Sequence, residues 1–146
     1  MGIFDSINIS SSALTAEKTR MDIISKNIAN ANTTRATGGL PYRRQMVVYE
    51  ENKNDQFSSY LDRSTNKFNG NGVVISEVIE DETPFKLKYE PGHPDADENG
   101  YVMLPNVDVV SEMVNMIDAQ RAYEANVTAM NTTKSMLMKA LEIGRR

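Results

Sequence analysis

The chain has 146 residues and a formal net charge of −4, with 16 Lys and Arg against 20 Asp and Glu. This length suits one domain with a modest core, and the acidic balance excludes the broad basic face that nucleic-acid binding requires. The chain has no cysteine, which excludes disulfides and thiolate chemistry. Because of the acidic balance, we expect no nucleic-acid partner.

The positions of glycine and proline divide the chain into three regions. All five prolines and six of the eight glycines lie between residues 38 and 105. Because proline breaks helices and glycine weakens them, this pattern predicts an N-terminal helix in 1–37, a β-rich insert in 38–105 and a C-terminal helix in 106–146. The expected fold class is α+β, with the two helices forming an antiparallel coiled-coil pair.

The N-terminal region has a narrow apolar seam at helical spacing. Its members recur every seven residues at Ile7, Leu14, Met21 and Ile28. The seam also includes Ile24, three positions after Met21. Many Ser, Thr and Asn residues lie between them, so the helix is expected to need a partner surface. The first residues show no basic segment followed by an apolar run, and no apolar run reaches the roughly 20 residues of a membrane span. We expect neither a cleaved signal nor a direct membrane span.

The insert has four segments rich in strand-forming residues, separated by turn residues. Strands are predicted near 42–49, 73–79, 85–89 and 101–104, of which 85–89 alternates cleanly between apolar and basic residues. Residues 50–72 are polar and are expected to form a mobile loop.

The C-terminal region has the clearest periodicity in the chain. Apolar and aromatic residues alternate at spacings of three and four, and we predict that they form a subunit-packing seam: Met113, Met116, Tyr123, Val127, Met130, Leu137 and Leu141. Gln120 and Lys134 fall on the same ladder as polar interruptions. Asn106 or Asp108 is the expected N-cap, and a helix from there to Gly144 would be roughly 55 Å long. A globule of this size cannot cover such a stripe, so part of it is expected to meet other subunits.

The sequence offers little for catalysis or metal binding. The one histidine, His93, lies in a turn, and the acidic run 80–82 is interpreted as a solvated turn. Residues 95–100 match the first half of an EF-hand loop, but Asn106 stands where the closing glutamate belongs. An Asx-rich turn is the favoured interpretation, while calcium binding there stays open. We expect no catalytic residue, no cofactor and no metal.

Two runs carry a resemblance to a known family. Residues 27–33, Asn-Ile-Ala-Asn-Ala-Asn-Thr, resemble the signature of the bacterial flagellar axial proteins of the rod and hook. Residues 106–126 are similar to the end of the proximal-rod members, and 89–97 and 100–108 to their middle region. The motif positions are Asn27, Ile28, Ala29, Asn30, Thr33, Asn106, Asp108, Glu112, Arg121, Tyr123, Glu124 and Asn126. Other members carry Gly with an aromatic residue just after the threonine, whereas here Gly38-Gly39 comes later, which suits the proximal-rod type.

This resemblance implies a structural subunit of the flagellar basal body and not an enzyme. Such proteins polymerise into the proximal rod, the drive shaft that crosses the periplasm, through packing of their terminal helices. The implied partners are other rod subunits, rod-base and MS-ring or hook–basal-body proteins, and the flagellar type III export apparatus, which exports these proteins without a cleaved signal. The alternative is a self-contained helical adaptor or chaperone-like module that binds a partner's helix in a groove.

Overall fold

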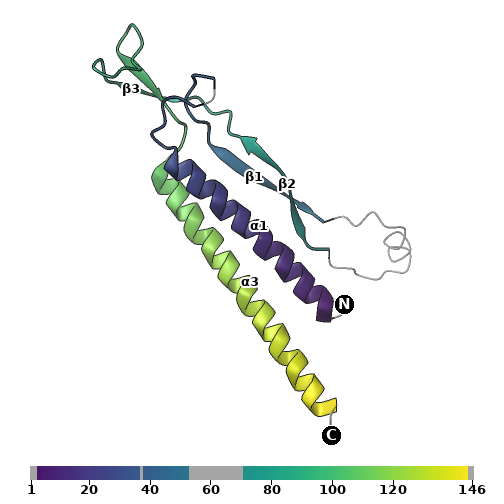
Figure 1. The fold of residues 1–146 in the computed structure, drawn as a ribbon. Helices are drawn as coiled ribbons and strands as arrows, with labels where there is room; N and C mark the ends of the chain where they lie inside the picture. Colours follow the sequence, from purple (N-terminus) through teal and green to yellow (C-terminus); the bar gives the residue numbers. More distant parts are fainter. Residues whose placement is uncertain (1–2, 37, 53–70, 145–146) are drawn as a thin grey trace. The chain divides into compact units, whose positions relative to one another are not determined.

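A computed structural model describes residues 3–36, 38–52 and 71–144 and shows two long terminal helices packed together, with small hairpins between them (Figure 1). The elements in chain order are α1 (Ile3–Ala29), β1 (Gln45–Glu51), β2 (Val73–Glu80), β3 (Lys86–Tyr89), β4 (Tyr101–Leu104) and α3 (Val109–Gly144). The predicted α+β class and the two helical regions are confirmed. Most of the expected loop, residues 53–70, lies outside the described residues.

Contacts divide the chain into two compact units, each containing part of both helices. The central unit comprises Arg20–Val48 and Glu77–Asp118, and the end unit comprises Met1–Thr19, Tyr49–Ser76 and Ala119–Arg146. In the central unit the last turns of α1 share a core with the first turns of α3, which is the antiparallel arrangement. Its buried apolar residues include Ile24, Tyr42, Val102 and Val107.

Helix α3 begins where the chain supplies a side-chain cap. The Asp108 carboxylate accepts hydrogen bonds from the backbone N–H and the hydroxyl of Ser111, and the Asp108 carbonyl accepts the N–H of Glu112 at 2.9 Å. The two bonds from Ser111, led by that of its hydroxyl, lower the pKa of Asp108. Asp108 is thus the N-cap, one of the two residues predicted for that position. Across the described ranges, no helix is both long and apolar enough to cross a bilayer.

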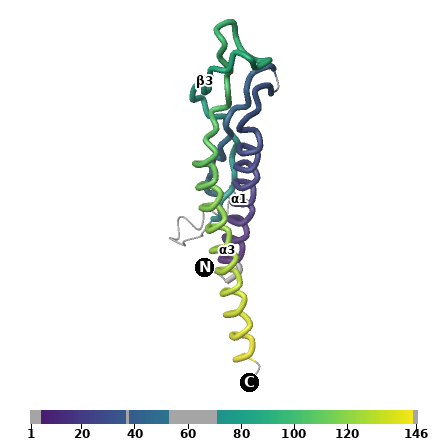
Figure 2. Tube along the Cα trace, turned by 90° about the vertical axis from the view of Figure 1, so that its left-hand side faces the viewer, coloured from purple at the N-terminus to yellow at the C-terminus, as the bar shows by residue number. Residues whose placement is uncertain are grey.

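The strands form two separate two-stranded sheets, β1 with β2 and β3 with β4. In the second sheet the strands are antiparallel, with Lys86 opposite Leu104 and Tyr89 opposite Tyr101. The chain passes from this hairpin into the first turn of α3, as a second view shows (Figure 2). The predicted strand 101–104 is confirmed to the residue. The first strand starts later than predicted, at Gln45, because the N–H of Arg44 donates to the Asn106 side chain.

Candidate functional site

The most elaborate constellation in the central unit is a buried polar cluster centred on Asn27. This residue, near the end of α1, has 1% of its surface exposed. Its amide nitrogen donates to Glu112 Oε2 at 2.9 Å and to the carbonyl of Gln45 at 2.8 Å. Its amide oxygen accepts the Tyr42 hydroxyl at 2.8 Å and the N–H of Gln45 at 2.9 Å. All four hydrogen-bonding positions of the amide are therefore filled, as burial requires.

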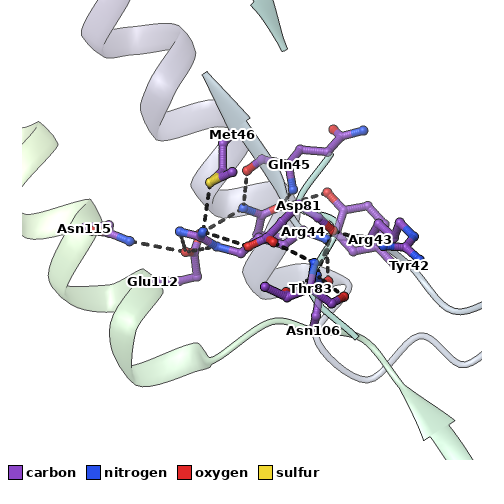
Figure 3. Close-up of polar contacts among 11 residues, drawn as sticks. Tyr42, Arg43, Arg44, Gln45, Met46, Asp81, Thr83, Asn106, Glu112 and Asn115 are labelled. Carbon is purple, nitrogen blue, oxygen red and sulfur yellow. Dashed lines mark hydrogen bonds and ion pairs between the residues drawn. The ribbon is translucent and has the colours of Figure 1, made fainter. Parts of the chain in front are cut away.

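The charge at this site is carried by Glu112 and Arg44. Glu112, in the first turn of α3, is also 1% exposed, and its Oε1 accepts hydrogen bonds from Arg44 Nε at 2.9 Å and from Arg44 Nη2 at 2.8 Å (Figure 3). Burial alone would lower the pKa of Arg44, but its hydrogen bonds and ion pair with Glu112, helped by Asp81, raise that pKa above its ordinary value. A buried carboxylate is thus paired with a fork of two donors, the arrangement that makes its burial tolerable.

Asn106 joins the segment before α3 to the two segments that flank β1 and β2. Its side-chain oxygen accepts the N–H of Arg44 at 2.8 Å, and its nitrogen donates to the carbonyl of Asp81 at 3.0 Å and to the Thr83 hydroxyl at 2.8 Å. Because its side chain is used in this way, Asn106 is not the helix cap.

The acidic run 80–82 is only in part the solvated turn that its charge suggested. Glu80 and Glu82 are exposed, but Asp81 is half-buried, and its carboxylate lies 3.4 Å from Arg44 Nη1. The backbone N–H of Thr83, then the Thr83 hydroxyl and Arg44, lower the pKa of Asp81. Asp81 therefore belongs to the polar cluster, which we define as Asn27, Tyr42, Arg44, Gln45, Asp81, Asn106 and Glu112.

Three motif residues, Asn27, Asn106 and Glu112, meet in this cluster although up to 85 positions separate them. Their partners Tyr42, Arg44 and Asp81 were not among the candidates. No periodicity marks these three residues, because each lies beside a strand and bonds to a segment distant in sequence. The sequence carried one indication of these partners. A buried glutamate requires a cationic partner, and Arg43 and Arg44, just before the first strand, can supply it.

The remaining motif residues form hydrogen bonds within their own helical turns or lie at the surface. The Asn30 side chain donates to the Lys26 carbonyl at 2.8 Å and accepts the Thr33 hydroxyl at 3.2 Å, which closes the end of α1. On α3 the Asn126 side chain donates to the Ala122 carbonyl at 2.9 Å, and Glu124 accepts a hydrogen bond from Gln120 at 3.1 Å. Ile28 and Tyr123 are half-buried, whereas Ala29 and Arg121 are exposed.

The predicted seam residues differ in how far the single chain covers them. Ile24 is buried, two are exposed (Met113 and Leu141), and the rest are half-buried: Ile7, Leu14, Met21, Ile28, Met116, Tyr123, Val127, Met130 and Leu137. The most buried positions of α3 are Glu112 and Ala119, each one residue before a member of the predicted ladder. Gln120 and Lys134 are exposed, so these polar residues do not interrupt the covered face. Contact of the seam with other subunits stays a prediction.

The half EF-hand motif is occupied by interactions within the chain. The Asp95 carboxylate pairs with Arg35 and accepts the Thr34 hydroxyl at 2.8 Å. Asp97 Oδ1 accepts the N–H groups of Asn99 at 2.9 Å and Tyr101 at 2.8 Å, which is an Asx turn. Among the residues that the structure describes, no group of three or more acidic or histidine side chains is placed to hold a metal ion.

Comparison with known proteins gives consistent matches along nearly the whole chain. Residues 7–37 match the family model for the flagella basal body rod protein, and residues 98–143 match that for the C-terminal part of flagellar basal body rod FlgEFG proteins. The flagellar basal-body rod protein FlgC of Bacillus subtilis is 52% identical, over 99% of this chain and all of that protein. FlgC of Borreliella burgdorferi is 47% identical over 98% of both chains, and FlgC of Salmonella typhimurium 42% over 99% of this chain and all of that protein.

These similarities confirm the resemblance carried by residues 27–33 and 106–126. They favour a structural rod protein over both the enzyme and the adaptor alternatives. The chain belongs to the FlgC family of flagellar basal-body rod proteins.

Proposed function

We propose that this chain is a subunit of the proximal rod, which it builds with other rod subunits through contacts between terminal helices. In this proposal it reaches the periplasmic portion of the basal body through the flagellar export apparatus, without a cleaved signal. Its insert then meets rod-base and MS-ring or hook–basal-body proteins. Family membership supports the structural role, and the surface of α3 supports the helical contacts.

The observation that carries the proposal is the apolar surface that α3 leaves in water. In the end unit, four large apolar side chains near the end of this helix are exposed: Met136, Met138, Leu141 and Ile143. Leu141, a predicted seam residue, has 66% of its surface exposed. At about 100° per residue, Met138 and Leu141 share one side of the helix, and Met136 and Ile143 share the opposite side. Each side gains free energy when a neighbour covers it.

The hydrogen bonding of the same helix also indicates that it depends on neighbours. The hydroxyls of Thr128, Thr132, Thr133 and Ser135 each donate to the carbonyl four residues earlier, at 2.9 Å. Such side-chain bonds compete with the backbone ladder and slightly weaken a helix. Packing against other subunits would offset this weakness.

Replacing Leu141 with Asp tests the proposal without disturbing the interior of the single chain. We expect the variant to be exported at normal levels but to be absent from isolated basal bodies, with loss of motility, because a charge would enter the helix–helix contact. Ser135→Asp adds the same charge at an exposed polar position and should assemble. The two measurements are immunoblots of purified basal bodies and swimming in soft agar.

Two results would count against helix-mediated assembly. One is normal motility of the Leu141→Asp strain with the variant present in its basal bodies. The other is light scattering of the purified full chain with a partner that shows one discrete complex of fixed stoichiometry, as an adaptor would form.

A further inference from the structure

The described part of the chain contains the dipeptide Asn-Gly twice, as Asn71-Gly72 before β2 and as Asn99-Gly100 before β4. Such a dipeptide can modify itself, because the backbone nitrogen of the glycine can attack the side-chain carbon Cγ of the asparagine before it. Glycine favours this reaction, since it has no Cβ to hinder the approach of its nitrogen. The outcome at each pair therefore depends on how the fold holds that nitrogen.

At Asn99-Gly100 the attacking nitrogen is buried and hydrogen-bonded. Gly100 is buried, and its N–H donates to the carbonyl of Asp97 at 3.0 Å. A Cβ added to Gly100 would lie 2.9 Å from the Tyr89 ring and 3.2 Å from Pro91, so its surroundings are tightly packed. The N–H of Asn99 also donates to Asp97, at Oδ1, at 2.9 Å. This turn must open before the Gly100 nitrogen can attack, and the fold thus protects the pair.

At Asn71-Gly72 the surroundings of the nitrogen are different. Asn71 is exposed and lies outside the strands, and among the described residues no acceptor is placed for the Gly72 N–H. The Asn71 side chain donates to Glu51 Oε1 at 3.3 Å, but both residues are exposed, so water competes for this bond. Gly72 is held through other atoms, since its carbonyl accepts the N–H of Asn52 at 2.7 Å and its Cα side faces Ser12.

We propose that Asn71 is a site of spontaneous deamidation in the folded chain, whereas Asn99 is protected. The Gly72 nitrogen forms a bond to Asn71 Cγ as the bond from Cγ to Nδ2 breaks. The proton that the Gly72 nitrogen gives up is balanced by the one that Nδ2 takes on as it leaves as ammonia. Water then opens the resulting succinimide ring at either carbonyl, which gives an aspartyl or an isoaspartyl residue.

The modification would act on the contact between α1 and β2 in the end unit. A carboxylate at position 71 would repel Glu51, which now accepts an amide donor. An isoaspartyl linkage also adds one backbone carbon, about 1.5 Å, directly before Gly72. The Gly72 site cannot absorb this change, because a Cβ there would already lie 2.2 Å from Ser12 Oγ. The Val73 N–H, which donates to that same oxygen at 3.1 Å, would be displaced.

Peptide mapping of the purified full chain after incubation in mildly alkaline buffer tests the proposal, and it does not depend on the proposed function. Fragment masses separate Asn71 from Asn69, which also precedes a glycine and lies outside the described residues. In the folded chain we expect Asn71 to convert at least about tenfold faster than Asn99, because a buried N–H reacts only through local opening. In urea the two residues should convert at similar rates.

Asn71→Gln is the matched control, because it keeps an amide near Glu51 but would have to form a larger ring, which closes much more slowly. It should stay unmodified at position 71. A second readout uses a chain with Asn69→Ser, whose incubated form is separated by ion exchange. The fraction with one extra negative charge should show faster hydrogen exchange at 71–76 and in the first turns of α1 than the unmodified fraction.

Similar rates at Asn71 and Asn99 in the folded chain would overturn the proposal. A conversion at Asn71 no faster than that at the exposed Asn52, which precedes a lysine, would overturn it as well. Unchanged hydrogen exchange in the charge-shifted fraction would contradict the effect on the contact between α1 and β2.

Discussion

The central and end units contain parts of the same two helices but are stabilised differently. In the central unit, segments distant in sequence are joined by charged and amide side chains whose hydrogen bonds are filled within the chain. In the end unit, α1 is joined to β2 through the hydroxyl of Ser12, whose Oγ accepts the N–H of Val73 at 3.1 Å. The surface of its α3 segment is apolar and exposed. The central unit therefore fills its hydrogen bonds with its own residues, whereas the end unit leaves apolar surface that a neighbour could cover.

The largest expected effect comes from removing the buried charge. Glu112→Ala removes the acceptor of two Arg44 donors, Nε and Nη2, and of one Asn27 donor, and loss of one partner of a buried pair costs about 3–5 kcal/mol. We expect a lower urea midpoint for the full chain and faster amide exchange throughout the central unit. Glu98→Ala, at an exposed position, should change neither. If exchange rose equally in the end unit, the difference between the units would disappear.

A smaller effect is expected where β2 approaches α1 in the end unit. A Cβ on Gly72 would lie 2.2 Å from Ser12 Oγ and 2.9 Å from Ser12 Cβ, so Gly72→Ala forces the segments apart at a cost of about 1–3 kcal/mol. Hydrogen exchange should rise at 71–76 and in the first turns of α1 while the central unit stays protected. Gly92→Ala is the control, since an added Cβ there meets nothing within 4 Å. Equal behaviour of the two variants would contradict the close approach.

The smallest effect concerns the loss of stability of the central unit at acid pH. The pKa of Asp81 is lowered below its ordinary value of 3.8 by the Thr83 N–H, the Thr83 hydroxyl and Arg44. A lowered folded-state pKa contributes stability that is present above pH 3.8 and is lost as the pH falls through the folded value. Asp81→Asn should therefore be slightly less stable at neutral pH, and its urea midpoint should approach that of the natural chain below pH 3.8. A difference in urea midpoint that stays constant at every pH would mean that titration of Asp81 does not contribute to the pH dependence of stability.

Local patterns predicted the helices and the outline of the strands, because helical periodicity, caps and glycine and proline positions act within a few residues. The Asp108 cap and the strand 101–104 are examples. The polar cluster was reached only through its motif residues, since the pairing of Arg44 with Glu112 depends on how distant segments meet. The covered face of α3 lies one residue earlier than the predicted ladder. Glu112, whose charge is paired in the interior, is buried in place of Met113, and the small Ala119 is buried in place of Gln120.

The separation between Asn27 and Glu112 has a consequence for the biosynthesis of the chain. Since these partners are 85 positions apart, a growing polypeptide lacks the acceptor for Asn27 until about three quarters of it has been translated. The Asn27 amide and the Arg44 guanidinium, both partners of Glu112, must therefore leave the ribosome still hydrated. Folding of the central unit is postponed to the end of synthesis, which leaves an interval in which the nascent chain can be captured by cellular factors before it closes on itself.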